Sequence, residues 1–235
     1  MKYIINGQSG IGKEIIKQLI NNGDEVTVIS SKNCEINGVK KSIIKNTSIE
    51  SEAEEAIEEA INSEEEMPDI IINTVGVLYN QDHSPEKKLD QLSKDWLLKS
   101  IEVNTLPTAY LAKYLSKKMK RSSNIKFLTF SAHVGCISDN TTGGWHSYRM
   151  SKCSLNMLIR NISNEWKFRF QESSIFGYHP GTVSTDTFND FQKNIDPEYI
   201  ITPEQAAKYC IENLNTFEKS QSGKLIDYQG NELEY

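Results

Sequence analysis

Short apolar segments alternate with longer amphipathic ones along almost the whole chain of 235 residues. The short segments are rich in β-branched residues and bounded by Gly, Pro, Asn or Asp, which is typical of strands. The long segments carry apolar residues at helical spacing. Strands that alternate with helices of this length predict a parallel sheet covered by helices on both faces.

Seven strands are predicted, at residues 2–6, 25–30, 41–44, 70–74, 125–131, 174–179 and 223–228. Helical segments are predicted at residues 11–22, 49–65, 94–120, 148–170 and 203–216, with a break at Pro107 because proline lacks a backbone N–H. Residues 132–147 and 184–201 are expected to be irregular. Since no linker or repeat is evident, we expect one doubly wound α/β domain over residues 1–235. Such sheets bind ligands outside the carboxyl ends of their strands.

Composition narrows the possible partners of the chain. The apolar fraction of 37% and the charged fraction of 25% are ordinary for a globular protein. The net charge of −6 disfavours non-specific binding to nucleic acid or to an anionic membrane. No apolar run reaches 18 residues, and the N-terminal run is too short for a signal peptide. We therefore expect a cytoplasmic protein with neither a nucleic-acid nor a membrane partner.

The cysteines and histidines predict no metal site. The four cysteines lack zinc-finger or redox-motif spacing and are expected to be free thiols: Cys34, Cys136, Cys153 and Cys210. The four histidines are scattered along the chain, and we expect surface or packing roles for them.

A glycine-rich turn joins the first strand to the first helix. Glycines at positions 7, 10 and 12 let the backbone approach a pyrophosphate closely, and the helix that follows offers free N–H groups and the positive end of its dipole. The segment predicts a dinucleotide-binding loop formed by Gly7, Ser9, Gly10, Ile11 and Gly12. A tight turn without any ligand is the alternative. A Walker-type loop is disfavoured because no Gly-Lys-Ser/Thr follows.

The end of the second strand bears on the choice of cofactor. A carboxylate there would bind the 2′-hydroxyl of an adenosine ribose and select NAD. The chain has Ser31 and Lys32 instead, which suit a 2′-phosphate. We therefore expect NADP(H) to be preferred over NAD(H), with an ordinary exposed lysine as the alternative for Lys32.

Tyr148 and Lys152 lie four residues apart on a predicted helix and so share one face of it. A nearby ammonium group can lower the pKa of a tyrosine from about 10 and suit it to acid–base catalysis. The spacing alone is weak evidence, since Tyr114 and Lys118 repeat it. Only Tyr148 follows the glycine-rich turn, the apolar strand that ends at Asn73-Thr74-Val75-Gly76 and the strand that ends at Ser131. An exposed helical pair is the alternative.

Taken in order along the chain, these features resemble the short-chain dehydrogenase/reductase family. That family carries a TGxxxGxG loop, NNAG, a helix Asn, a strand-end Ser, YxxxK and a later PG. Gly10 and Gly12 match the loop, while Asn6 replaces its first glycine. Asparagine tolerates a left-handed backbone, so we expect the turn to survive. The resemblance implies a Rossmann-like sheet of about seven strands.

Other motifs of the family recur later in the chain. Asn73 and Gly76 match NNAG, and Asn104 matches the helix Asn. Ser131 ends its strand, although Ala132 stands three residues before the glycine, where the family often has serine. The PG segment implies contacts with the nicotinamide part of the cofactor from Pro180, Gly181, Val183 and Thr185. The stretch 135–140, followed by Gly143-Gly144-Trp145 before Tyr148, resembles the branch that contains sniffer carbonyl reductases and C-factor signalling proteins.

The resemblance implies an NAD(P)-dependent enzyme that transfers a hydride between the nicotinamide and a small carbonyl or alcohol. Tyr148 would be the acid or base, and Lys152 would favour the phenolate and bind the nicotinamide ribose. Ser131 would bind the substrate oxygen, and Asn104 would hold a water that relays protons. Asn6, Asn73 and Gly76 would complete the cofactor site. Trp145, Phe188 and Phe191 either line a substrate pocket or pack elsewhere.

Two other functions stay open. The chain could be a C-factor-like nucleotide-binding signalling or interaction protein with weak or no catalysis, or a phosphate-binding α/β protein outside this family. Family members usually form homodimers or homotetramers, and we expect the same of this chain.

Overall fold

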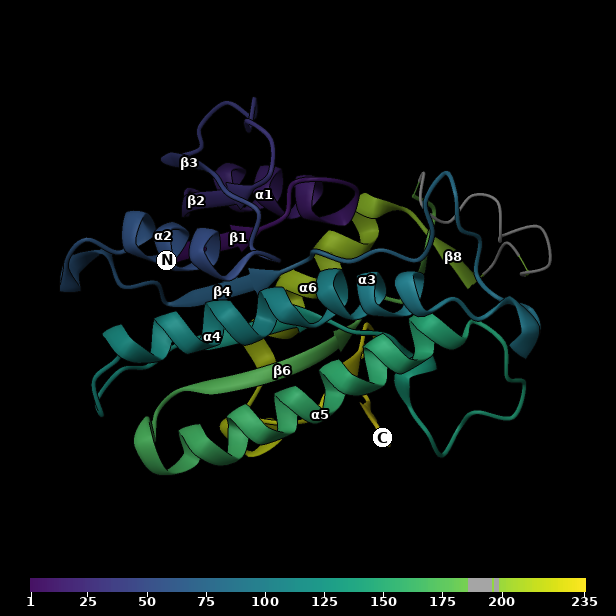
Figure 1. Ribbon diagram of the computed structural model, residues 1–235. Helices are drawn as coiled ribbons and strands as arrows, with labels where there is room; N and C mark the ends of the chain where they lie inside the picture. The colour runs from purple at the N-terminus through teal and green to yellow at the C-terminus, as the bar shows by residue number, and fades with distance from the viewer. Residues whose placement is uncertain (186–195, 197–198) are drawn as a thin grey trace.

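The strands of the chain assemble into one main sheet. In the computed structural model, which describes residues 1–185, 196 and 199–235, this sheet has eight strands in the order β10-β9-β6-β5-β4-β1-β2-β3 (Figure 1). The strands are β1 (Lys2–Asn6), β2 (Glu25–Ser30), β3 (Lys41–Ile44), β4 (Ile70–Asn73), β5 (Lys126–Phe130), β6 (Ser174–His179), β9 (Leu225–Asp227) and β10 (Glu232–Leu233). Only β10 runs antiparallel to its neighbour.

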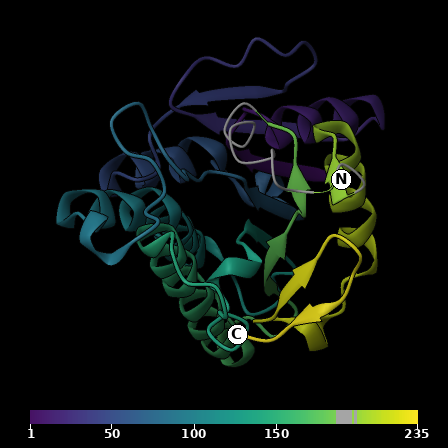
Figure 2. The ribbon, with the colours of Figure 1, turned by 90° about the vertical axis from the view of Figure 1, so that its right-hand side faces the viewer.

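The carboxyl ends of the parallel strands meet at one edge of this sheet. Figure 2 views the molecule from the side toward which β6 points in Figure 1. A separate pair of short parallel strands, β7 (Thr182–Val183) and β8 (Ile200–Ile201), follows β6 there. The order of the main sheet reverses between β1 and β4, and a reversal of this kind opens a crevice for ligands.

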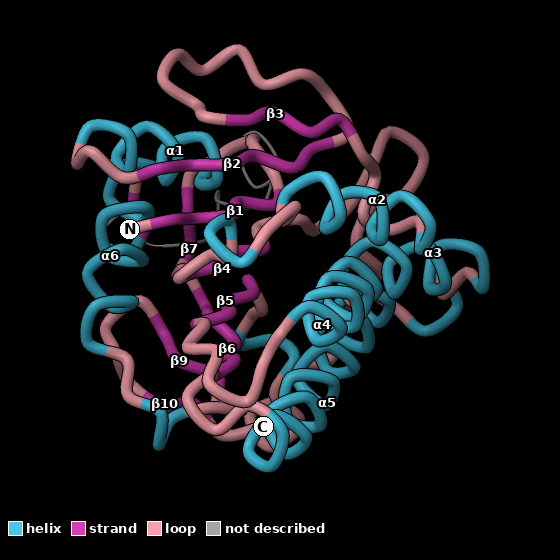
Figure 3. The backbone as a smooth tube through the Cα atoms, turned by 90° about the vertical axis from the view of Figure 1, so that its left-hand side faces the viewer, coloured by secondary structure: helices cyan, strands magenta, loops and turns pink. Residues whose placement is uncertain are grey.

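Helices cover both faces of the sheet (Figure 3). The helices are α1 (Ile11–Asn21), α2 (Glu50–Ala60), α3 (Lys94–Asn104), α4 (Leu106–Lys118), α5 (His146–Arg169) and α6 (Pro203–Thr216). Helices α1 and α6 pack side by side on one face, whereas α2, α4 and α5 cover the other. Short 3₁₀ helices lie at η1 (Glu64–Glu66), η2 (Leu89–Gln91), η3 (His133–Gly135) and η6 (Lys219–Gln221).

The core therefore has two halves, one on each face. Strand β4 is buried along its whole length, and its side chains alternate between the two halves. Ile71 packs with Leu111 and Leu155 on one face, while Ile72 packs with Ile15 on the other. Each fully buried isoleucine or leucine stabilises the fold by about 1.5–3 kcal/mol.

Most predicted elements are confirmed, and the differences have local causes. The acidic second helix ends at Ala60 instead of residue 65, because Ile61 leaves the helical conformation at φ −130° and ψ 85° to enter the core. The long helix begins at His146, two residues before its predicted start. Strands β7, β8 and β10 were not predicted, since two residues are too few for an alternating pattern.

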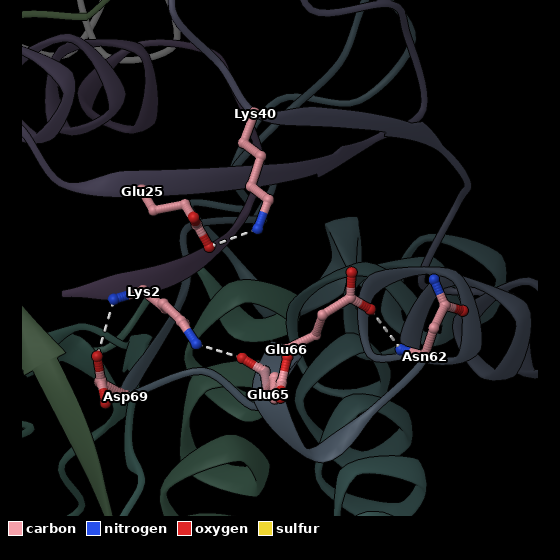
Figure 4. A network of polar contacts seen from close by, with 7 residues as sticks. All are labelled: Lys2, Glu25, Lys40, Asn62, Glu65, Glu66 and Asp69. Atoms are coloured by element: carbon pink, nitrogen blue, oxygen red, sulfur yellow. Dashed lines mark hydrogen bonds and ion pairs between the residues drawn. The ribbon is translucent and has the colours of Figure 1, made fainter.

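Polar contacts join the amino ends of the strands at the opposite edge (Figure 4). The backbone N–H of Lys2 donates to Asp69 over 2.8 Å, and the ammonium group of Lys2 donates to the carbonyl of Glu65. Lys40 and Glu25 pair over 2.7 Å in solvent. These contacts tie the starts of β1, β2 and β4 to the loops around them.

None of the helices in the described part of the chain is long and apolar enough to cross a membrane. All four cysteines are free thiols.

Candidate functional site

Two adjoining cavities occupy the carboxyl edge of the main sheet. The larger measures about 600 Å³ and reaches from the glycine-rich turn to α5 and the end of β6. The smaller measures about 270 Å³ and lies beside the ends of β2 and β3. Both are lined by Ser9, Thr74, Val75 and Gly76, so they form one continuous cleft across the point where the strand order reverses. A crevice at this point of a doubly wound sheet is where ligands bind.

The glycine-rich turn has room only for glycine. Gly7 has a φ of +102°, and a Cβ atom there would lie 2.5 Å from Thr74 Oγ1. A Cβ on Gly12 would lie 2.7 Å from the carbonyl oxygen of Gly7. The turn therefore leaves the start of α1 accessible from the cleft, where free N–H groups and the helix dipole favour a phosphate. This cradle fits the dinucleotide that the sequence predicts.

The left-handed conformation expected for Asn6 is wrong. Asn6 is the last residue of β1, and Gly7 takes the positive φ in its place. The side chain of Asn6 is buried and donates to Asn73 Oδ1 over 2.8 Å and to Thr47 Oγ1 over 2.9 Å. The positive φ therefore falls on Gly7, one residue after the predicted position, and the turn is preserved.

Asn73 lies behind the cleft and lines neither cavity. Its Nδ2 donates to Thr108 Oγ1 over 2.9 Å and to Thr129 Oγ1 over 3.2 Å. Together with Asn6 and Thr47 it forms a buried polar network that joins the ends of β1, β4 and β5 to α4. Buried amides must find partners, and here the partners hold the strand ends in register under the turn.

The smaller cavity brings two lysines together. Ser31 and Lys32 line it as expected, and Lys45 joins them from the end of β3. Lys45 also pairs with Glu55. The Gln8 side chain donates to the carbonyl of Lys32 over 2.7 Å and so ties the glycine-rich turn to the end of β2. Lysines on two adjacent strand ends give this cavity a positive side.

Tyr148 and Lys152 both line the larger cavity, one helical turn apart on α5. The ammonium nitrogen of Lys152 lies 5.7 Å from the centre of the Tyr148 ring. It donates to the carbonyl oxygen of Phe130, the last residue of β5, over 2.8 Å. Gly76 lies beside this side chain, since a Cβ there would lie 3.2 Å from Asn104 Oδ1 and 3.4 Å from the lysine nitrogen.

The pKa values of this pair differ from the sequence-based expectation. Burial lowers the pKa of Lys152 to about 8. Burial also raises the pKa of Tyr148 to about 12, whereas a lowered value was expected. The reason is that the hydrogen bond of Lys152 goes to Phe130 and not to the phenol, so desolvation dominates at the tyrosine. The phenol therefore keeps its proton at neutral pH.

A buried carboxylate positions the start of α5. Glu86 is 3% exposed, and its carboxylate accepts from the hydroxyl of Ser147 and, over 3.3 Å, from the backbone N–H of Ser147. The backbone N–H of Trp145 donates to the carbonyl of Glu86 over 2.6 Å. The negative charge satisfies free N–H groups at the positive end of the helix dipole. It also explains why the helix starts earlier than predicted.

Trp145 lines the larger cavity beside the catalytic candidates. Its ring packs edge-on to Tyr148 with the ring centres 6.3 Å apart, and its backbone is left-handed at φ 50°. Phe188 and Phe191, the other aromatic candidates, lie outside the described residues.

Ser131 lines the larger cavity, but its hydroxyl is engaged elsewhere. It is 3% exposed and donates to Asn156 Oδ1 on α5 over 2.6 Å. Ala132 also lines the cavity and offers no polar group. The hydroxyl of Ser131 thus contacts Asn156, and its expected role in binding a substrate oxygen stays a prediction.

Asn104 lies at the end of α3 and lines neither cavity. Its Oδ1 accepts from the backbone N–H of Val77 over 2.6 Å, and its Nδ2 donates to Val77 O and to Ser151 Oγ over 2.9 and 2.8 Å. The side chain thus ties the loop after β4 to α5. This arrangement holds Lys152 and Gly76 in place. The expected water that Asn104 would hold for proton relay stays a prediction.

The remaining predicted residues line the larger cavity: Gly10, Ile11, Pro180, Gly181, Val183 and Thr185. Cleft-lining residues that sequence reasoning missed include Gln8, Lys45, Asn46, Thr47, Thr74, His133, His179 and Ser184. Lys45, Asn46 and Thr47 directly follow a predicted strand, so the rule that strand ends form the site would have identified them. No motif or pattern in the sequence indicated a role for Glu86.

Comparison with known proteins agrees with this geometry. The family model for short chain dehydrogenases matches residues 2–196. A 1-hydroxy-2-glutathionyl-2-methyl-3-butene dehydrogenase of Rhodococcus sp. (strain AD45) is 25% identical over 234 residues, which are 99% of this chain and 98% of the relative. C-signal of Myxococcus xanthus is 23% identical over 137 residues, which are 58% of this chain and 77% of the relative.

A solved structure shares the fold over the full length. The crystal structure of an NADPH-bound carbonyl reductase from chicken fatty liver superposes with a TM-score of 0.81 at 17% identity, and it covers 100% of this chain and 98% of its own. The chain belongs to the short-chain dehydrogenase family and is an oxidoreductase with the Rossmann-like sheet of that family. The alternative of a phosphate-binding protein outside the family is therefore wrong.

Proposed function

We propose that the chain is an NADP(H)-dependent carbonyl reductase or alcohol dehydrogenase in which Tyr148 is the acid or base. The observation that carries this proposal is that Tyr148, Lys152 and the glycine-rich turn line one cleft at the carboxyl edge of the sheet. The 235 residues act as one nucleotide-binding domain in this proposal.

The residues of the cleft have different roles in the proposed reaction. Gly7, Gly10 and Gly12 shape the turn that holds the pyrophosphate, and the bound dinucleotide supplies or accepts the hydride. Tyr148 donates the phenolic proton to the substrate oxygen during reduction and takes it back during oxidation. With a pKa of about 12 the phenol holds its proton before reduction, and the transfer depends on stabilisation of the phenolate by Lys152.

Lys152 supports the tyrosine in two ways. Its positive charge, 5.7 Å from the ring centre, stabilises the phenolate that forms when the proton leaves. Its bond to Phe130 O keeps the ammonium group of this buried lysine against the end of β5.

Tyr148→Phe tests the assignment. General acid catalysis contributes about 10²–10⁴-fold, so we expect kcat for carbonyl reduction to fall by that factor while NADPH binding is kept. Tyr114→Phe is a matched control, because Tyr114 and Lys118 have the same spacing on α4 but face Glu50 and Ile61 outside the cleft. Full activity of Tyr148→Phe would contradict the proposal.

The preference for NADP(H) rests on Lys32 and Lys45 in the smaller cavity. Two ammonium groups beside this pocket favour a 2′-phosphate, and the chicken carbonyl reductase with its bound NADPH supports the same cofactor. We expect Lys32→Ala to weaken NADPH binding by about 10-fold, or about 1.4 kcal/mol, and to leave NADH binding unchanged. Quenching of tryptophan emission measures both affinities. Lys40→Ala, on the opposite edge, is the control, and equal loss for both cofactors would refute the preference.

The wall of the larger cavity points to uncharged substrates. Its described side chains are mostly apolar, including Leu78, Phe130, Val134 and Trp145, and Lys152 is the only lysine or arginine among them. The Rhodococcus relative acts on an alcohol that carries a glutathionyl group. A glutathione conjugate brings several charges, so we favour small aromatic or aliphatic carbonyls and alcohols. A turnover screen that includes both classes decides between them.

A second function is supported by one observation. The hydroxyl of Ser131 is engaged with Asn156, and the relative C-signal carries a signalling name. A nucleotide-binding signalling protein would bind NADPH without turning over any carbonyl in the screen. We further propose that the protein is cytoplasmic and forms a homodimer or homotetramer, which sedimentation measures.

A further inference from the structure

The residues shortly before Tyr148 have an unusual backbone. Gly143, Gly144 and Trp145 take φ values of 65°, 68° and 50° in succession, so all three lie in the left-handed region. Glycine adopts this conformation freely, whereas a bulky side chain rarely does. Trp145 is the only non-glycine residue with a positive φ in the part of the chain that the structure describes. Such a conformation persists only where surrounding contacts enforce it, and it is most frequent at functional sites.

Contacts from two other residues hold this turn. The backbone carbonyl of Glu86 accepts from the N–H of Trp145 over 2.6 Å. The buried carboxylate of Glu86 accepts from the hydroxyl of Ser147, two residues further along the chain. From α5, Nε of Arg149 donates to the carbonyl oxygen of Gly144 over 3.1 Å. The residues before and after Trp145 are therefore fixed, and these contacts enforce its left-handed conformation.

Arg149 also connects two walls of the larger cavity. Its Nη1 donates to the carbonyl oxygen of Val134 over 3.2 Å, and its Nη2 donates to Thr142 Oγ1 over 3.1 Å. Val134 lines the larger cavity, whereas Arg149 lines neither cavity. The guanidinium group therefore joins the segment that carries Val134 to the turn that carries Trp145 without entering the space that a substrate would occupy.

The turn places an indole in the cavity wall beside the proposed acid. Trp145 lines the larger cavity, and its ring packs against Tyr148 with the ring centres 6.3 Å apart and the planes at 70°. Leu78 and Phe130 add apolar surface to the same cavity. A flat apolar wall at this place favours a flat apolar substrate, because two rings gain from stacking in addition to burial. An indole that is already fixed loses little freedom when a substrate binds.

We propose that Trp145 determines the substrate specificity of the cleft, in that its indole is the wall against which an aromatic group next to the reacting carbon stacks. Glu86 and Arg149 are positioning residues, since they act through the turn that holds Trp145. This assignment rests on the proposed reductase function and narrows its substrates from small uncharged carbonyls and alcohols to aromatic ones.

The ratio of kcat/KM for benzaldehyde to kcat/KM for propanal, measured with NADPH, tests the proposal. We expect Trp145→Ala to lower this ratio by about 10-fold, chiefly through a higher KM for benzaldehyde, because the stacked ring is lost. Trp145→Phe keeps a ring and should recover most of the ratio. Trp96→Phe, at a tryptophan that lines neither cavity, is the control and should leave the ratio unchanged. An unchanged ratio in Trp145→Ala would overturn the proposal.

A double substitution separates positioning from a merely structural role. Arg149→Met removes the hydrogen bonds to Gly144 and Val134, so we expect the benzaldehyde-to-propanal ratio to fall several-fold when Trp145 is present. In the Trp145→Ala background there is no indole left to position, so Arg149→Met should not change the ratio further. Equal falls in the two backgrounds would show that Arg149 acts independently of Trp145 and would refute its positioning role.

A binding measurement keeps this inference distinct from the proposed function. With 5-fluorotryptophan at the three tryptophan positions, the fluorine NMR signal that is missing from Trp145→Phe identifies Trp145. In the NADPH complex of Tyr148→Phe, the unreactive analogue benzamide should shift this signal, and butyramide at equal concentration should shift it less. If this holds while the parent reduces neither aldehyde, the reductase proposal fails and the aromatic-binding role stands. If the parent reduces benzaldehyde but benzamide leaves the Trp145 signal unmoved up to its solubility limit, the role of Trp145 fails alone.

Discussion

The two edges of the main sheet terminate the same strands in opposite ways. At the amino edge, Lys40 and Glu25 pair over 2.7 Å with side chains that are 47% and 41% exposed. At the carboxyl edge, the amides of Asn6 and Asn73 meet over 2.8 Å, and each residue is 1% exposed. The amino-edge pair is therefore solvated, whereas the carboxyl-edge pair is buried.

The chemical type of the side chains explains the difference. Charged groups lose several kcal/mol when they leave water, whereas neutral amides can be buried once all their hydrogen bonds are made. The buried amides hold the strand ends rigidly beneath a turn whose own N–H groups stay available for a ligand. From this contrast we expect the amino edge to tolerate substitution better than the carboxyl edge.

The glycines of the two edges give the largest expected difference. Gly7→Ala introduces a Cβ 2.5 Å from Thr74 Oγ1 at a φ of +102°, so we expect about 3 kcal/mol less stability and at least about 10-fold weaker NADPH binding. Gly23→Ala, at a φ of +82° with no atom within 4 Å, should lose about 1 kcal/mol and keep its NADPH affinity. Urea unfolding measures the stability of the two variants, and fluorescence titration measures their NADPH affinity. Equal losses in the two variants would show that the two edges do not differ.

Lys152 should make stability depend on pH. Its pKa is about 8 in the folded protein against 10.5 ordinarily, so the unfolded chain binds more protons between these values and stability rises with pH there. The penalty of the buried charge is complete below pH 8 and is relieved toward pH 10.5, a change of about 3 kcal/mol.

The lysine contribution is isolated by substitution. The unfolding free energy of the parent minus that of Lys152→Met should rise by this amount across the window, because contributions from buried thiols and phenols are common to both proteins. Lys40→Met, at the solvated edge, should show no such trend. If the difference in unfolding free energy between the parent and Lys152→Met did not change with pH, the ammonium group would be well hydrated in the folded protein.

The buried network at the carboxyl edge should tolerate substitution poorly. Asn73→Ala removes one hydrogen-bond partner from each of Asn6, Thr108 and Thr129, while Asn6 keeps Thr47 and the two threonines keep each other. We expect a loss of about 2 kcal/mol in thermal or urea unfolding. Weaker NADPH binding should accompany it, because the strand ends support the turn. Unchanged stability would show that water replaces the amide.

The charged pair at the amino edge should give the smallest effect. Glu25→Gln removes the ion pair with Lys40, and exposed pairs contribute about 0.2–1 kcal/mol. We expect a loss of no more than about 0.5 kcal/mol, which 1 M NaCl abolishes, and unchanged cofactor binding. A loss as large as that of Asn73→Ala would remove the distinction between the edges.

Much of the fold was predictable because local patterns agree with it. The bounds of β1, β2, β3, β6 and α6 match their predictions, since each has a clear apolar period and a turn or cap beside it. The glycine-rich turn, Tyr148 and Lys152 were placed in one cleft by the rule that strand ends form the site. Asn73 was assigned to the cofactor by motif, and its burial behind the cleft depends on side chains from three other elements.

The sequence by itself determined the alternation of strands and helices, the family, and the candidate residues Tyr148 and Lys152 of the cleft. Periodicity, glycine and proline positions and motif order are local properties, and they are legible without coordinates. Only the tertiary structure decided the hydrogen-bond partners, namely Asn156 for Ser131, Asp139 for His133 and Phe130 for Lys152. The pKa of Tyr148 follows from those partners and from burial, which arise only when distant segments of the chain pack together.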